Sequence, residues 1–290
     1  MSFEKRLKSK EFVVLAEMNT PKGVDISRFV TDARRIKGRV DAVVVPDMDN
    51  GVMRMSALAG GVLAQQQGLE AIIHVYGRDR NRMALQGDLL AAHVLGLRNL
   101  IVVAGEEMAN SDQREAVAVD DLDEMDLLGA ISSLQAGKDL AGFDLDGSPE
   151  FVAGCALSPC EDEAALAAEL ATAQKKVSAG ARFVIAPPVF DVDRFLAFAE
   201  QAHALQVPII PTVFLIKSVA VARYIATNEP WSHLSEALIK RIRKSANREM
   251  EGIKIAGETI AQLRRHAGGV MIQTMGWEHR LPTILDEAGI

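Results

Sequence analysis

The sequence predicts an α/β protein, a (β/α)8 TIM barrel that forms one domain over residues 1–290. Three observations predict it. Eight apolar runs have the length of strands, and each precedes a stretch with a helical pattern. Five of these runs begin one or two residues after a glycine that ends a helical stretch. The chain length suits one barrel better than a doubly wound sheet. The five joints read KGRVDAVVVP, QGLEAIIHVY, LGLRNLIVVAG, AGARFVIAPP and AGGVMIQTM.

These joints are typical of a helix that leads into a buried parallel strand. A glycine just past a helix accepts the left-handed conformation that closes it, and an unbroken apolar run suits a strand that is covered on both faces. Three further runs, Phe12–Glu17, Phe151–Leu157 and Val207–Val213, bring the predicted strands to eight.

The segments between the strands suit an outer ring of helices, because their apolar residues recur every three or four positions. The expected helices are Asp25–Ile36, Met55–Gln66, Arg82–Leu95, Glu161–Ser178 and Asp191–Leu205. An acidic segment after the fourth strand, about 105–150, is expected to form an extended loop above the barrel mouth, with one helix at Glu124–Gln135. Two helices are expected within Pro230–His266, before the last strand.

Composition excludes several classes of protein. The net charge of -7 and the lack of a basic patch argue against nucleic-acid binding. No apolar run is long enough to span a membrane and the N-terminus MSFEKRLKSK has no apolar core, so we expect a cytoplasmic protein without a membrane partner. Cys155 and Cys160 lack the companions of a zinc site, so no metal is expected. Nucleotide-binding glycine motifs are missing too. A homo-oligomer is the default expectation.

Candidate functional residues gather where strands end, which is where barrels build their sites. They are Glu17, His74, Arg78, Gly105, Glu106, Ser158, Pro187 and Gln273. Glu17 follows VVLA directly, so its carboxyl belongs at the inner rim, where apolar walls would raise its pKa and make it a proton donor. An ion pair with a neighbouring strand-end base is the alternative. Arg78 and the nearby arginines suit an anionic ligand, or else they pair with Asp79 and Asp88 at the start of the helix.

Four motifs in order resemble the methylenetetrahydrofolate reductase family, whose members are (β/α)8 flavoproteins. LAEMNTPKG is similar to the family's first strand and its E-x-x-P signature, and IIHVYGRDRN is similar to its third strand and the loop after it. NLIVVAGEE stands where the family has an apolar strand that ends in Gly-Asp. KKVSAGARFVIAPPVFD is similar to the family's K-V-x-A-G-A segment with its following strand and F-D pair.

The resemblance implies roles for particular residues. Glu17 stands at the family's catalytic glutamic acid, which protonates the folate and opens its methylene bridge to an iminium that flavin reduces. His74, Gly105, Glu106 and Lys176 match positions that contact FAD, with Lys176 suited by charge to the pyrophosphate. FAD, with FMN as an alternative, is therefore the expected cofactor. A tetrahydrofolate derivative and a nicotinamide or protein electron donor are the expected partners.

The chain also departs from the family pattern at the expected site. Glu106, a longer acid, replaces the family's aspartate and is assigned both a catalytic and a binding role. Pro187 replaces a folate-binding glutamine, and Ser158 stands where the family often has histidine. Gln273, at the end of the last strand, is a further candidate for contact with the substrate.

The expected function is the flavin-dependent reduction of 5,10-methylenetetrahydrofolate to 5-methyltetrahydrofolate, or the reverse oxidation, with Glu17 as general acid. Two alternatives stay open. One is a methyltransferase-type barrel that binds methyltetrahydrofolate without flavin. The other is a non-catalytic subunit of a larger one-carbon redox complex.

Overall fold

Eight parallel strands close into a barrel in chain order, because β1 pairs with β2 on one edge and with β8 on the other. The computed structural model of the chain describes residues 1–290, apart from the side chain of Asp49. The strands are β1 (Val13–Glu17), β2 (Ala42–Val45), β3 (Ala71–Val75), β4 (Asn99–Val102), β5 (Val152–Ala156), β6 (Val184–Pro188), β7 (Ile209–Phe214) and β8 (Gly269–Gln273). The predicted single-domain (β/α)8 barrel is confirmed.

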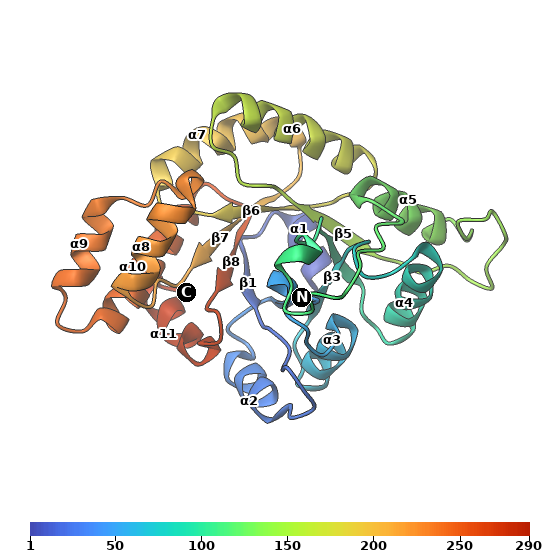
Figure 1. Cartoon of the computed structure of the whole chain (residues 1–290), viewed down its shortest axis with the longest axis horizontal. Helices are drawn as coiled ribbons and strands as arrows, with labels where there is room; N and C mark the ends of the chain where they lie inside the picture. The colour runs from blue at the N-terminus through green and yellow to red at the C-terminus, as the bar shows by residue number, and fades with distance from the viewer.

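The α-helices surround the barrel, with α6 and α7 on one side and α2 and α3 on the opposite side (Figure 1). They are α1 (Phe3–Ser9), α2 (Ser27–Ile36), α3 (Ala57–Gln66), α4 (Arg82–Val94), α5 (Glu124–Gln135), α6 (Glu163–Ser178), α7 (Val192–Ala202), α8 (Val219–Asn228), α9 (Glu236–Lys244), α10 (Arg248–Leu263) and α11 (Leu281–Glu287). Short 3-10 turns are η1 (Asp49–Gly51), η2 (Met108–Asn110), η3 (His203–Leu205), η4 (Pro230–Ser232) and η5 (Glu278–Arg280). The two helices expected within Pro230–His266 are α9 and α10.

The barrel interior is filled by alternate residues of the strands, as a period of two requires. Its buried apolar cluster is Val13, Leu15, Ala42, Val44, Ile72, Ile101, Val152, Phe183, Ile185, Ile210 and Met271, joined by Phe3 and Leu7 of α1. The Phe3 and Phe183 rings meet edge to face with their centroids 5.1 Å apart. Because Phe183 lies at the start of β6, α1 closes the N-terminal end of the barrel. The sequence had offered no apolar run that would predict this plug.

Four of the five glycine joints have the expected conformation. Gly38, Gly68, Gly96 and Gly180 have φ between 79° and 125°, each between a helix and the next strand. The fifth joint, before β8, has no glycine with positive φ among the described residues, so the prediction is wrong there. Gly268 is instead a point of close approach, since a Cβ at this position would lie 2.8 Å from the Cβ of Pro208.

The long segment after β4 has two parts. Helix α5 belongs to the outer ring, where it buries Leu127, Leu128, Ile131 and Leu134 at helical spacing. The part before it, residues 105–123, is drawn in front of the strands in Figure 1. Its turn η2 contacts η1, which lies in the loop after β2. We call residues 105–123 the mouth loop.

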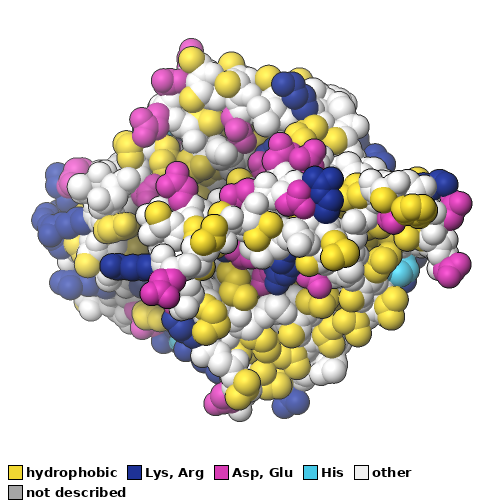
Figure 2. Space-filling model, turned by 45° about the vertical axis from the view of Figure 1, so that its right-hand side comes forward, with side chains coloured by type: hydrophobic (Ala, Val, Ile, Leu, Met, Phe, Trp, Pro, Cys, Tyr) yellow, Lys and Arg dark blue, Asp and Glu magenta, His cyan; other side chains and the backbone are white. Residues whose placement is uncertain are grey.

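Exposed apolar side chains gather on one surface of the protein. Apolar side chains gather on the lower part of the face shown in Figure 2, toward the side where α3 and α4 lie in Figure 1. Helix α3 contains no charged residue, and α4 with its cap exposes Met83, Val94 and Leu95. Within the described chain, no helix combines the length and the apolar character that crossing a membrane requires.

Candidate functional site

Three predicted side chains lie at the C-terminal end of the barrel interior. Glu17 continues the inward series of Val13 and Leu15 on β1, His74 follows Ile72 on β3, and Gln273 follows Met271 on β8. Strands β1 and β8 are neighbours. The alternation of the strands therefore places a carboxyl, an imidazole and an amide at one end of the barrel.

Glu17 is bound to Gln273. The Gln273 side-chain amide donates to Glu17 Oε2 at 2.7 Å, and Glu17 is only 4% exposed. In this contact the partner of Glu17 is an amide, and not the basic residue of the alternative prediction. An amide can serve both protonation states, because its nitrogen donates to a carboxylate and its oxygen accepts from a carboxylic acid after a flip.

His74 lies half-buried at the same end of the barrel. Burial lowers the pKa of His74 to about 4, although the charge of Glu106 acts in the opposite direction. The imidazole is therefore neutral at pH 7, so it can both donate and accept a hydrogen bond. Such a ring suits an uncharged polar ligand better than a phosphate.

Arg78 is 4% exposed and is held by acidic neighbours. Its guanidinium donates to both oxygens of Asp79, at 2.8 and 2.9 Å, and to Glu106 Oε2 at 3.0 Å. It also donates to the Tyr76 hydroxyl at 3.0 Å. These contacts raise the pKa of Arg78, with the hydrogen bonds to Asp79 as the first cause. Arg80 likewise pairs with Asp47 and Asp88.

Gly105 and Glu106 begin the mouth loop. Gly105 has φ of +78°, and a Cβ there would lie 3.4 Å from the Cβ of Arg78, so this turn favours glycine. Glu106 accepts from Arg78 and also, through Oε1, from the backbone N–H of Asn50 at 3.0 Å. Further along the loop, Asp112 accepts from Lys22 and from the backbone N–H of Met53. The mouth loop is thus tied to the loops that follow β1, β2 and β3.

Lys176, on α6, is 3% exposed and forms an ion pair with Glu124 of α5 at 2.7 Å. Its Nζ also donates to the carbonyl of Ala156 at 3.5 Å. The nearby thiol of Cys155 is buried, which raises its pKa to about 12. Lys176 therefore links two outer helices to the end of β5.

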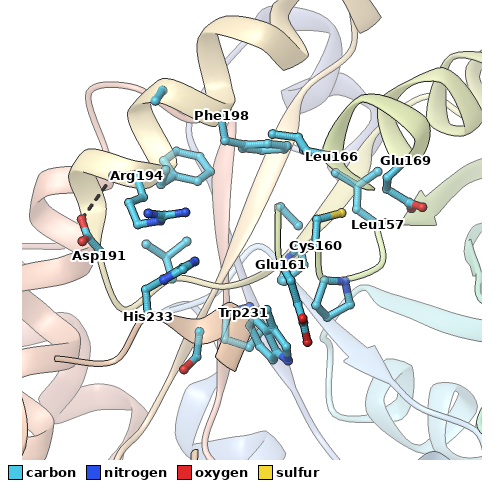
Figure 3. A pocket seen from close by; sticks show the side chains of 18 of the residues that line it. Leu157, Cys160, Glu161, Leu166, Glu169, Asp191, Arg194, Phe198, Trp231 and His233 are labelled. Atoms are coloured by element: carbon cyan, nitrogen blue, oxygen red, sulfur yellow. Dashed lines mark hydrogen bonds between the residues drawn. The ribbon is translucent and has the colours of Figure 1, made fainter. Parts of the chain in front are cut away.

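Ser158 and Pro187 line a different space, a cavity of about 550 Å³ that none of the other predicted site residues lines. It lies between α6 and α7, and Figure 3 shows Leu166 and Phe198 across one side and Trp231 on the opposite side. We call it the α6–α7 cavity. The eight strand-end candidates thus divide between the barrel mouth and this cavity.

The arrangement does not fit the diphosphate of FAD. Lys176, expected to meet the pyrophosphate, and Arg78, expected to suit an anionic ligand, are each within 3.0 Å of a carboxylate and almost fully buried. A diphosphate would have to displace Glu106 and Glu124 from them, and these carboxylates would then repel it. Among the described residues, no group of three His, Cys, Asp or Glu side chains is placed to hold a metal ion.

Several contacts of the site were not found from the sequence. Tyr76 follows His74 by two residues, so the alternation along β3 could have found it. Glu124 is separated from Lys176 by 52 positions, and no local pattern pairs them. Trp231 and Arg194 line the α6–α7 cavity, and no motif in the sequence marks either of them.

The whole chain can be compared with known proteins. The sequence model of the family described as methylenetetrahydrofolate reductase matches residues 2–289. No curated protein matches the chain. An uncharacterized protein from Clostridium thermocellum, described as binding two copies of 5-methyl-5,6,7,8-tetrahydrofolic acid, is 13% identical with a TM-score of 0.71, and the match covers 100% of both chains.

A second solved structure is more distant. It is an F420-dependent secondary alcohol dehydrogenase in complex with an F420-acetone adduct, 13% identical, with a TM-score of 0.54, and the match covers 94% of this chain and 98% of the other. At these identities the two structures show the shared fold alone. The family match, by contrast, spans nearly all residues. The chain belongs to the methylenetetrahydrofolate reductase family.

Proposed function

We propose that the barrel mouth binds a tetrahydrofolate derivative and that Glu17 acts as general acid in the interconversion of 5,10-methylene- and 5-methyltetrahydrofolate. The observation that carries the proposal is the buried Glu17 carboxyl, oriented by Gln273 at the C-terminal end of the barrel in a chain of this family. The description of the Clostridium thermocellum protein, which binds methyltetrahydrofolate, supports the substrate class.

The chemistry assigned to Glu17 is a single proton transfer. In the reducing direction, Glu17 gives its proton to N10 of the folate, the bond from the bridging carbon to N10 breaks, and an iminium remains at N5. The carboxylate that is left carries the opposite charge to this iminium and stabilises it. Gln273 then donates to that carboxylate, as it does in this structure. The hydride that reduces the bridging carbon would come from a reduced flavin such as FMN or from a reduced nicotinamide, either of which is oxidised in the step.

Lys217 is the residue we assign to the glutamyl carboxylates of folate. It follows β7, and its Nζ donates to the carbonyl of Met275 and lies 5.1 Å from the centre of the Trp277 ring. Burial lowers the pKa of Lys217. Among the described side chains, no carboxylate lies within ion-pair distance of it, so this cation is available to an acidic ligand.

A second function is favoured by the ion pairs of Arg78, at the mouth, and of Lys176, on α6. Because both cations already neutralise carboxylates, these residues suit a folate better than a flavin dinucleotide. This supports the alternative of a methyltransferase-type barrel that binds methyltetrahydrofolate without flavin and hands its methyl group to a partner protein.

The test is a visible absorption spectrum of the purified protein, followed by anaerobic calorimetric titration with 5-methyltetrahydrofolate. Binding of the folate is expected under either function. A flavin band that bleaches on addition of the folate would support the oxidoreductase, whereas a colourless protein that binds folate and takes up neither FAD nor FMN would support the alternative. Absence of folate binding would contradict both.

A further inference from the structure

The acid assigned to the reaction is closed off from solvent. Glu17 is 4% exposed, although a general acid must come within hydrogen-bond reach of the atom that it protonates. With so little of its surface exposed, this carboxyl cannot meet a folate unless part of the protein moves. The mouth loop is the segment that crosses this side of the barrel, because it contacts the loops after β1, β2 and β3 (Figure 1).

The middle of the mouth loop, residues 107–118, makes few apolar contacts with the barrel. Within this segment, all of whose residues the structure describes, only Ser111 is buried, and Val117 is 84% exposed. Little apolar surface would therefore enter water if the segment left the barrel. Segments with few buried apolar contacts open locally at a fraction of the free energy that global unfolding requires.

Asp112 fastens this segment to the neighbouring loops. Its carboxylate forms an ion pair with Lys22, after β1, and accepts from the backbone N–H of Met53 at 3.1 Å. Its own backbone N–H donates to the carbonyl of Gly51 at 2.9 Å. The side chains of Lys22 and Asp112 are 52% and 27% exposed, so water can solvate both charges when they separate. These contacts can therefore break and form again readily.

Both ends of the segment are anchored. Before it, Glu106 accepts from the buried guanidinium of Arg78 at 3.0 Å. After it, Asp121 forms an ion pair with Arg82 at 2.8 Å. Asp120, between the segment and this second anchor, has φ of +45°, a backbone conformation that few residues other than glycine adopt. A segment with fixed ends and one fastening in the middle can swing outward while the barrel stays folded.

We propose that residues 107–118 form a lid over the barrel mouth, which Asp112 latches to the loops after β1 and β2 and which opens to admit the substrate to Glu17. The lid rests on the proposed function in one respect, since it takes Glu17 as the residue that the substrate must reach. Its opening, by contrast, belongs to the protein without any ligand. Lys22 and Asp112 control access to the site and do not touch the reacting atoms.

A cysteine in place of Glu17 measures access to the closed mouth. In a Glu17→Cys/Cys160→Ser protein the remaining native thiol, Cys155, is 0% exposed, so N-ethylmaleimide at low concentration labels position 17 when the lid opens. Asp112→Ala in this background should speed labelling about 10-fold, because the closed state loses charge-assisted contacts. Asp144→Ala is the matched control, since it breaks a solvent-exposed ion pair outside the lid and should leave the labelling rate unchanged.

Hydrogen exchange tests the lid with Glu17 in place. The backbone N–H groups of Met53 and Asp112 are bonded across the latch, so they should exchange well before those of the barrel strands. Asp112→Ala should speed exchange at Met53 about 10-fold and leave the strands unchanged. Equal labelling rates with Asp112→Ala and Asp144→Ala, or latch N–H groups that exchange only as slowly as the strands, would overturn the lid.

Failure of the lid and failure of the proposed function give different results. Both measurements use the protein without ligand, and neither depends on catalysis. A latch that opens as expected in a protein that binds no 5-methyltetrahydrofolate would support the lid and count against the proposed function. Folate turnover by a protein whose latch N–H groups exchange only with the strands would overturn the lid and leave the proposed function intact.

Discussion

Arg78 determines much of what the barrel mouth can bind. Its guanidinium lies between Asp79 and Glu106, and the same arginine contacts Tyr76 and, through the carbonyl of Met48 at 3.4 Å, the loop after β2. A cation that is buried and fully hydrogen-bonded in this way holds loops together. It would bind an external anion only if one of its carboxylates moved away.

The first prediction concerns the competition between Glu106 and an external anion for the Arg78 guanidinium. Replacing Glu106 by Gln removes one carboxylate from Arg78 and should raise the affinity for FAD or FMN about 10-fold, since a charge-assisted contact is worth roughly 1.5 kcal/mol or more. Quenching of flavin fluorescence on titration with protein measures it. Glu107→Gln is the matched control, because Glu107 is the exposed neighbouring acid. Equal flavin affinities of the two variants would show that Glu106 does not restrict the mouth.

The second prediction concerns His74 and pH. Its pKa of about 4 lies below the value of 6.5 for an unperturbed histidine, so between these two values the unfolded chain binds more protons than the folded protein. Stability should therefore fall as pH falls through this window. From pH 7 to pH 5 the contribution of His74 is about 2 kcal/mol.

Urea denaturation at the two pH values measures this contribution. His74→Gln should lose less stability than the unmodified protein on acidification, by about 2 kcal/mol. If both proteins lose the same free energy of unfolding between pH 7 and pH 5, burial does not lower the pKa of His74 in the folded protein.

The positions of the site residues could be predicted from the sequence better than their partners. Glu17, His74 and Gln273 were found because a strand of known length and period fixes which residue reaches the rim. The contact between Glu17 and Gln273 joins residues 256 positions apart, and the pair of Lys176 and Glu124 joins two helices. Such contacts depend on how the elements pack, which periodicity does not encode.

At the scale of elements, the strands were predictable because each one is buried on both faces and therefore continuously apolar. Helix α1 was not, since only Phe3 and Leu7 of its seven residues are buried. The joint before β8 failed for a related reason. A glycine there serves close packing against Pro208, and the sequence does not distinguish that use from a helix cap.

The third prediction concerns packing between β5 and β6. Gly154 faces the barrel interior, where a Cβ would lie 2.4 Å from Cζ of Phe183. Gly154→Ala should therefore destabilise the protein by about 1–3 kcal/mol, the usual effect of overpacking a core. Chemical denaturation gives the value.

A double variant separates overpacking from other causes. Phe183→Leu leaves room for the added methyl group, so Gly154→Ala should be less destabilising in that background than in the unmodified protein. If the effect of Gly154→Ala is the same in both backgrounds, the Phe183 ring is not the source of the strain.

The whole molecule presents two unlike sides around the barrel mouth. Over β1 to β4, the mouth loop and its ion pairs tie the strand-end loops together. Over β5 and β6, the α6–α7 cavity stays open between the helices. The covered side holds Glu17 and its neighbours, and the open side is lined by apolar and aromatic side chains such as Phe195, Phe198 and Trp231.

The measurement that tests the central claim most directly compares Glu17→Gln with the unmodified protein in folate binding and folate turnover. Both proteins are titrated with 5-methyltetrahydrofolate, and both are then assayed for its conversion to the methylene form with added FMN and an artificial electron acceptor. We predict that both bind the folate with similar affinity and that only the unmodified protein converts it. Equal turnover by Glu17→Gln, or no folate binding by the unmodified protein, would contradict the assignment of Glu17 as the acid of a folate site.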